Sequence, residues 1–290
     1  MKTLKFISLL LILALGMASV SAQDATPNVA ITLERTACFG TCPIYTVSIL
    51  EDGTVLYNGQ DFVEVKGEQT GQIEPETVTQ MVEAFEEAGY FEWDAAYDEM
   101  FVTDMPTITT SVTRDGETHT IVRYAGDDSA PLALPFLELW IDQMTNTGLW
   151  TGVTSDISSA GHGTMIPLVT LQREACFGFC PIYSVAAYED GTIVYLGNAN
   201  VENIGVHIFK TDDFAVTSVA ERAHIFGYFE WQDSYEEYMM TDQATVITSV
   251  RWEDEFKRIV RYDGDLNAPI GVVRVEEMID QLVPDVTAAD

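Results

Sequence analysis

The chain has 290 residues, of which 14 are basic and 46 acidic, so its formal net charge is −32. A field of this sign repels nucleic acids and anionic membrane surfaces, which excludes both as expected partners. Hydrophobic residues make up 47% of the chain and aromatic residues 11%, which is ample for packed cores and argues against a disordered protein.

The first 22 residues are typical of a cleaved secretory signal peptide. Lys2 and Lys5 precede an apolar run from Phe6 to Leu15, and small residues lead up to Ala22. No later stretch reaches the roughly 18 uninterrupted apolar residues that a membrane span needs. We therefore expect residues 1–22 to be removed and the mature chain to be secreted, periplasmic or on the cell surface, without a membrane span.

The rest of the chain contains an internal repeat. A shift of 138 residues aligns residues 30–144 with residues 168–282 without a gap, and 50 of the 115 pairs are identical. Two copies of this length are typical of two tandem domains, because a solenoid needs three or more shorter units.

Each copy begins with a pattern typical of strands. Ala30–Arg35 is predicted as a short strand, and alternating apolar residues on both sides of Asp52-Gly53 predict a hairpin. Phe62–Lys66 is predicted as a further strand. The first half of each copy is therefore expected to be a sheet.

Two helices and a second hairpin complete each copy. Val78, Met81, Val82 and Phe85 have helical spacing, and Gly89 follows as a helix stop. A hairpin is expected around Asp115-Gly116, and an apolar stripe that includes Leu134, Leu137 and Ile141 predicts the closing helix.

This order lacks the strand–helix–strand alternation of parallel sheets. We therefore predict an α+β fold of two tandem homologous domains, each an antiparallel sheet with two helices packed on one face. The expected domains span residues 30–145 and 167–284. The segment 146–166 between them, rich in Gly, Ser and Thr, is expected to be a flexible linker, in which Trp150 is a candidate contact with one domain.

All four cysteines lie in two matching turns, CFGTCPIY at Cys38–Tyr45 and CFGFCPIY at Cys176–Tyr183. In an oxidising compartment the leading interpretation is a local disulfide in each turn, Cys38–Cys42 and Cys176–Cys180. The glycine inside each turn is expected to supply a backbone conformation with positive φ.

Two other uses of these cysteines remain open. Four thiolates from both turns are a possible zinc site, provided that the turns meet and stay reduced. Thiol redox catalysis is a further possibility, although redox cysteines are typically followed by a helix, and here Pro43 and Pro181 lead into a strand.

The motif around these turns resembles the signature of the uncharacterised bacterial domain-of-unknown-function family 6438. It is the run RxxCFGxCPxY at Arg35–Tyr45, followed by a DG turn and YxG at Tyr57–Gly59. The resemblance covers nearly all of each copy. It implies an exported bacterial protein whose activity is not established, and it adds no mechanism.

Arginines and tyrosines found in both copies are candidate ligand contacts. Basic residues are rare in this chain, so arginines present twice are expected to be held by a carboxylate or an aromatic face. A structural ion pair and recognition of an anionic ligand group are the two interpretations. The candidate residues are Arg35, Tyr45, Arg123, Arg173, Tyr183 and Arg261.

Glu92 and Asp104, with their counterparts Glu230 and Asp242, are candidates for an acid and base pair of a hydrolase. The alternative interpretation is structural, because Asp104 directly precedes a strand and is suited to a turn. No histidine occurs at matching positions of both copies, so a Ser-His-Asp or Cys-His arrangement has no support.

One segment of the chain partly matches the sequence pattern of a calcium-binding loop. Asp263, Asp265 and Asn267 have the spacing of its first ligands, but Ala268 and Arg274 stand where glycine and glutamate are required. We therefore exclude an EF-hand and assign no metal site and no cofactor, while weak binding of divalent cations by the acidic loops stays open.

The two copies do not share a recognisable set of catalytic residues. This favours a non-catalytic binding or interaction module. The expected partner is an unknown protein or glycan outside the cytoplasm, and tandem sites gain avidity for a repetitive target. Two alternatives are a secreted hydrolase that uses the paired carboxylates and an inhibitor that presents the CFGxCP loop to an enzyme cleft. No catalytic residue is assigned.

Overall fold

A computed structural model describes residues 27–99, 104–159, 165–237 and 242–284. The predicted signal peptide at residues 1–22 lies outside these ranges. In the described part of the chain no helix is both long and apolar enough to cross a membrane.

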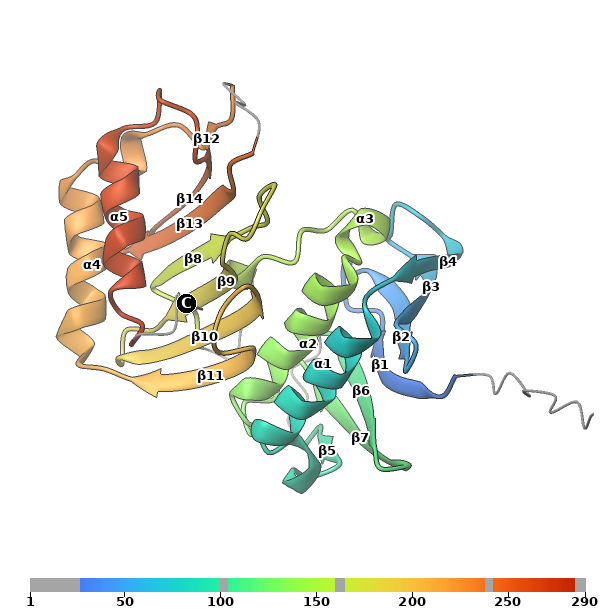
Figure 1. The fold of residues 1–290 in the computed structure, drawn as a ribbon. Coiled ribbons are helices and arrows are strands. Elements are labelled where there is room, and N and C mark those ends of the chain that lie inside the picture. The colour runs from blue at the N-terminus through green and yellow to red at the C-terminus, as the bar shows by residue number, and fades with distance from the viewer. Residues whose placement is uncertain (1–26, 100–103, 160–164, 238–241, 285–290) are drawn as a thin grey trace, which may run out of the picture.

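The first unit contains a seven-stranded sheet with the strand order β4-β3-β2-β1-β6-β7-β5 (Figure 1). Its elements are β1 (Val29–Arg35), β2 (Ile44–Leu50), β3 (Thr54–Asp61), β4 (Gly67–Gln72), α1 (Pro75–Glu87), β5 (Ala96–Tyr97), β6 (Thr107–Arg114), β7 (Glu117–Tyr124) and α2 (Ala133–Thr145). A short helix, α3 (Gly148–Thr151), and a 3₁₀ turn at Ile157–Ser159 follow.

The second unit repeats this order in a sheet arranged β11-β10-β9-β8-β13-β14-β12. Its elements are β8 (Val169–Arg173), β9 (Ile182–Ala187), β10 (Thr192–Ala199), β11 (Gly205–Lys210), α4 (Asp213–Ile225), β12 (Ser234–Tyr235), β13 (Thr245–Trp252), β14 (Glu255–Tyr262) and α5 (Ile270–Asp280). In Figure 1, α4 and α5 lie together on one side of this sheet. The predicted α+β fold of two tandem domains is therefore confirmed.

Local sequence explains the hairpins. Residues of β2 alternate between buried and partly exposed, as a strand with one face on the core requires. Asp115 and Gly116 have φ of 53° and 81°, and two consecutive positive φ values are what a two-residue type I′ turn needs. This turn sets the register between β6 and β7, and the register determines which of their residues face the core.

Two expectations about the sheet are wrong in detail. The sheets are mixed, because the short edge strands β5 and β12 run parallel to β7 and β14. The strand expected at Phe62–Lys66 lies instead at β4, whose sequence GEQTGQ has no apolar alternation. Phe62 has φ of 53°, so the chain turns there. Backbone pairing to β3 fixes β4, and such pairing leaves no signature in polar residues.

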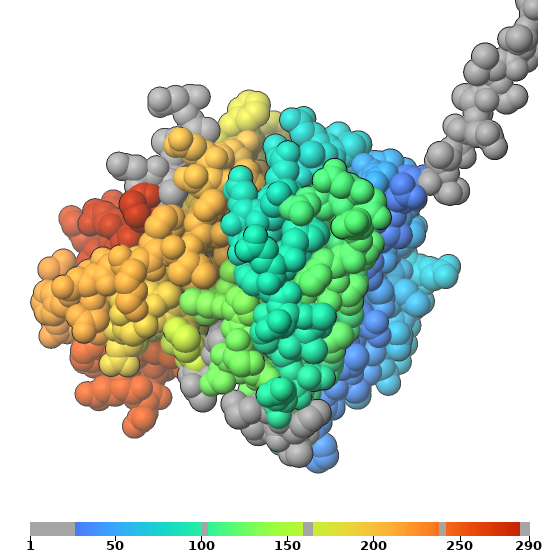
Figure 2. All heavy atoms as spheres, turned by 90° about the horizontal axis from the view of Figure 1, so that it is seen from below, coloured from blue at the N-terminus to red at the C-terminus, as the bar shows by residue number. Residues whose placement is uncertain are grey.

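The two units pack against each other. One apolar core contains Leu139 and Trp140 of α2 together with Val194 and Leu196 of β10. A Cβ placed at Gly205 of β11 would lie 2.6 Å from Cβ of Ala84 in α1, so the backbones approach closely there. Figure 2 shows the orange and yellow second unit in direct contact with the teal and green part of the first unit. The helices α1 and α2 of the first unit therefore cover β10 and β11 of the second sheet.

The described part of the segment between the units differs from a flexible linker. Trp150 lies 5.0 Å from the ring of Tyr57 between centroids, and its carbonyl accepts a hydrogen bond from Val65 N at 2.8 Å. Ile157 is fully buried. Asp156 is bound by Nε of Arg258 in the second unit at 2.5 Å. Composition suggested flexibility, but contacts to both units hold this segment in place.

Candidate functional site

Both cysteine turns are closed by disulfides, as predicted. Cys38 bonds Cys42 and Cys176 bonds Cys180, with Cα–Cα distances of 5.7 and 5.8 Å. This pairing uses all four cysteines and leaves no thiolate for the zinc or redox alternatives. The expected positive φ at the turn glycines is wrong, because neither Gly40 nor Gly178 is among the residues with positive φ. A five-residue loop closes here without a left-handed residue.

The disulfide turns carry exposed aromatic side chains. Phe39 is 87% exposed, Phe177 88% and Phe179 93%. The first turn is further fixed by the main chain, because Phe39 N donates to the carbonyl of Asp104 at 3.2 Å. The turns therefore hold apolar side chains out into solvent on a covalently closed backbone.

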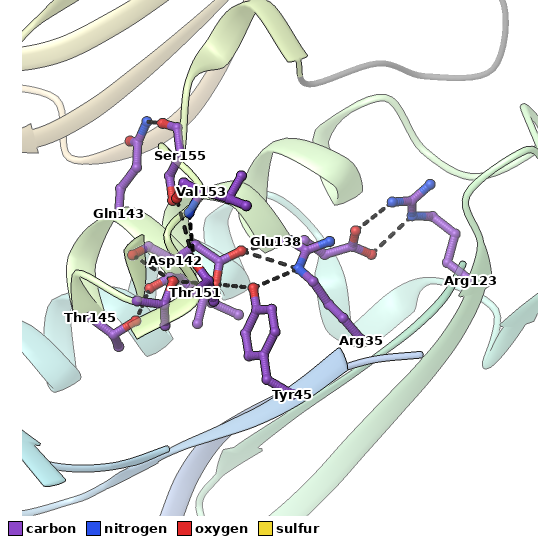
Figure 3. A network of polar contacts seen from close by, with 12 residues as sticks. Arg35, Tyr45, Arg123, Glu138, Asp142, Gln143, Thr145, Thr151, Val153 and Ser155 are labelled. Carbon is purple, nitrogen blue, oxygen red and sulfur yellow. Dashed lines mark hydrogen bonds and ion pairs between the residues drawn. The ribbon is translucent and has the colours of Figure 1, made fainter. Parts of the chain in front are cut away.

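Beside the first turn, Arg35, Tyr45 and Asp142 form a hydrogen-bonded network (Figure 3). The Tyr45 hydroxyl donates to Oδ1 of Asp142 at 2.6 Å, and Arg35 donates to the Tyr45 oxygen at 2.9 Å and to Oδ2 of Asp142 at 2.8 Å. Burial, and then the charge of Asp142, raise the pKa of Tyr45 well above its usual value. Tyr45 therefore remains a hydrogen-bond donor at neutral pH.

The second copy repeats this network. Tyr183 donates to Oδ1 of Asp280 at 2.6 Å, and Arg173 donates to Oδ2 of the same carboxylate at 2.6 Å. Burial is the main cause of a raised pKa of Tyr183. In both copies the arginine is on the first strand, the tyrosine on the second strand and the aspartate near the end of the last helix.

A second arginine in each copy is paired with a buried glutamate. Arg123 of β7, which is 4% exposed, donates to both oxygens of Glu138 on α2 at 2.9 and 2.5 Å. Arg261 donates to both oxygens of Glu276 at 2.7 Å. Arg261 also pairs with Asp263 at 2.8 Å, whereas the corresponding residue of the first copy is Ala125.

A cavity of about 410 Å³ lies beside these networks in the first unit. Its polar lining includes Arg35, Arg123, Glu138 and Asp142, and Cys42 and Pro43 link it to the disulfide turn. Residues 153–155, which follow α3, also line the cavity. Gln143 holds this segment with a hydrogen bond to the carbonyl of Ser155 at 2.9 Å. We call this space the first cavity.

A second cavity, of about 650 Å³, lies between the two units. It is lined by Arg173 and Glu174 of the second unit and by residues at the end of α2. Asp142, Thr154 and Ser155 line both cavities. The two cavities therefore adjoin, and each lies near one of the two CFGxCP turns.

Two segments of the chain match one and the same family model. The model of the domain of unknown function DUF6438 matches residues 29–145 and residues 167–283. The chain belongs to this family. No curated protein and no solved structure matches it.

The structure places the candidate ligand contacts of these two DUF6438 copies unequally. Arg35, Tyr45 and Arg123 line the first cavity, and Arg173 lines the second. Tyr183 and Arg261 line neither of the two. Each arginine has a carboxylate partner, so the structural ion pair exists at all four positions.

Sequence reasoning missed the carboxylates that complete the networks. Asp142 matches Asp280 and Glu138 matches Glu276 in the same 138-residue alignment, so the signal was present in the duplication. The carboxylates proposed for a hydrolase are placed differently. Glu92, Asp104, Glu230 and Asp242 are exposed, and none of them lines either cavity.

Proposed function

We propose that the chain is an exported, non-catalytic binding module that holds a partner protein through its two disulfide turns. The observation that carries this proposal is the exposure of Phe39, Phe177 and Phe179, at 87%, 88% and 93%. Covering one such side chain contributes roughly 1.5 to 3 kcal/mol. Aromatic residues that a protein holds out on rigid loops are typical of binding surfaces.

Rigidity supports the same proposal. A loop that is already closed by a disulfide loses little conformational entropy when a partner binds it, so more of the contact energy appears as affinity. The disulfides also support an oxidising location such as the cell exterior or periplasm, in agreement with the signal-like residues 1–22. A partner enzyme whose cleft receives one turn is the second candidate, favoured by the same exposed turns.

Selection of a peptide phage library on the oxidised protein tests the proposal. Affinities of the selected peptides are then measured for the wild type and for the triple variant Phe39→Ala, Phe177→Ala, Phe179→Ala. We expect the triple variant to bind at least about 100-fold more weakly, which corresponds to roughly 3 kcal/mol.

Phe214→Ala is the matched control, because Phe214 is 71% exposed on helix α4, away from both turns. It should leave affinity unchanged. Equal affinity of the wild type and the triple variant, or no selected peptide that binds the soluble protein, would contradict the proposal. A glycan array is screened in parallel. Binding to a glycan on this array, without binding to any peptide, would show that the partner is a glycan and not a protein.

A further inference from the structure

The two copies differ at one position beside the second arginine. Ala125 and Asp263 occupy equivalent places, since Ala125 N donates to the carbonyl of Pro106 as Asp263 N donates to that of Ala244. In the second copy Asp263 adds a second carboxylate to the guanidinium of Arg261, at 2.8 Å. In the first copy Ala125 stands at this position and lines the first cavity, and among the described residues Glu138 is the carboxylate that pairs with Arg123.

Asp263 pairs with Nη2 of Arg261, and the matching Nη2 of Arg123 is bound by Glu138 alone within the described residues. Arg123 also has a second, separate donor without a partner. Its Nη1 atom is buried and makes no hydrogen bond within the described part of the chain. A guanidinium carries five N–H donors, and a buried donor without an acceptor is destabilising. Arg123 itself lines the first cavity, so an acceptor that enters there would meet this guanidinium.

The rest of the first cavity differs from its counterpart in polarity. Met105, Pro106 and Leu139 line it in the first copy, whereas the second copy has Gln243, Ala244 and Glu277 at these positions. Its volume of about 410 Å³ lies in the range of pockets for small organic molecules. The first cavity thus combines an apolar part of its lining with an arginine that has an unpartnered donor.

We propose that the first cavity binds a small organic carboxylate, whose carboxyl group accepts from the guanidinium of Arg123, at Nη2 as Asp263 does on Arg261 and at the unpartnered Nη1. The apolar body of the ligand lies against Met105, Pro106 and Leu139. The second copy is the precedent within the same chain, since its arginine–glutamate pair holds a second carboxylate. This site is independent of the exposed phenylalanines.

Hexanoate and phenylacetate are suitable probes, with hexanamide and phenylacetamide as neutral counterparts of the same shape. Binding is measured by calorimetry and by chemical shifts of the Met105 and Ile108 methyl groups. We expect each acid to bind at least about tenfold more tightly than its amide, because hydrogen bonds to an ionised acceptor are stronger.

Ala125→Asp supplies the acceptor that the second copy already has, and it should weaken the binding of both acids by about tenfold or more. Ala96→Asp is the matched control, because Ala96 is an exposed residue of the adjacent strand β5 and does not line the cavity. It adds the same charge nearby and should leave binding within about twofold. A crystal structure with hexanoate gives a readout that does not depend on the folding of Ala125→Asp.

Three results would overturn the proposal. They are equal affinity for acid and amide, acid binding that survives Ala125→Asp, and the absence of saturable binding at millimolar concentrations. Hexanoate found in a crystal away from Arg123 would overturn it as well.

Discussion

The hydroxyl of Tyr45 donates to Asp142 over a distance of 2.6 Å, and the two residues lie 97 positions apart in the chain. The same separation and the same distance join Tyr183 to Asp280. This contact ties the last helix of each copy to its second strand, directly after the disulfide turn.

Removal of the Asp142 carboxylate should destabilise the first unit. Asp142→Ala leaves Arg35, Tyr45 and Thr147 without their common acceptor, and we expect a loss of about 3 kcal/mol in the free energy of unfolding. The surface pair Lys66–Asp61 gives the control Asp61→Ala, which should cost less than about 1 kcal/mol. Urea unfolding followed by circular dichroism measures both, and similar losses in the two variants would refute the structural role of the network.

The buried pair of Arg123 and Glu138 should show strong coupling. Glu138→Ala leaves a buried guanidinium without its partner, so it should cost about 3 to 5 kcal/mol. Replacement of both residues, Arg123→Met with Glu138→Leu, removes both charges and should recover much of that loss. A double-mutant cycle measures the coupling, and additive effects would show that the pair does not act as a unit.

High pH should unfold the protein through its buried tyrosines. Burial raises the pKa of Tyr45, Tyr183 and Tyr228 in the folded chain, while unfolded tyrosine keeps a pKa of 10.0. The folded state therefore holds these protons more tightly, and the stability they contribute is complete below pH 10 and is lost as the pH rises above it. Absorbance at 295 nm with circular dichroism should show tyrosinate formation together with unfolding, whereas reversible ionisation of all tyrosines near pH 10 in a folded protein would contradict this.

Reduction of the disulfides should loosen the turns and leave the domains folded. A loop closed over a separation of four residues contributes only about 2 kcal/mol by chain entropy. We expect Cys38→Ser with Cys42→Ser to lower the melting temperature by several degrees while far-ultraviolet circular dichroism is unchanged. Hydrogen exchange should increase in residues 38–42 first, and global unfolding on reduction would show that the bridges do more than close the turns.

Alanine substitutions at two glycines should distinguish the cost of disturbing the contact between the units from the cost of backbone strain. Gly205 and Gly67 have φ of 89° and 85°, but a Cβ at Gly67 meets nothing within 4 Å, whereas one at Gly205 meets Ala84. Gly67→Ala should cost about 1 to 2 kcal/mol from φ alone. Gly205→Ala should cost about 1 to 3 kcal/mol more, because the packed interface must shift. Equal unfolding free energies of the two variants would show that the units do not press together at this point.

The parts of the fold that sequence predicted are those governed by local patterns. Apolar periodicity and turn residues placed both hairpins and both helices, because these depend on residues close in the chain. Strand β4 and the parallel pairing of β5 depend on backbone hydrogen bonds to distant strands, which polar sequences such as GEQTGQ do not reveal.

The candidate site was predictable in part, for the same reason. Arg35, Tyr45 and Arg123 stood out because both copies have them, and Asp142 and Glu138 could have been found by the same comparison. The cavities could not, because residues 153–155 complete the lining of the first, and the second forms between the two packed units. The difference between Ala125 and Asp263 is visible in the sequence, but only the structure shows that Asp263 pairs with Arg261 and that Ala125 and Arg123 line the same cavity.

Because α1 and α2 cover β10 and β11, the order of the two units in the chain matters for biosynthesis. Synthesis runs from the N-terminus, so both helices exist before β10 and β11 emerge. Val194 and Leu196 are therefore made when the surface that buries them is already available. A nascent chain with the opposite order of units would expose this apolar sheet face until the last helix was complete, which is the period when aggregation competes with folding.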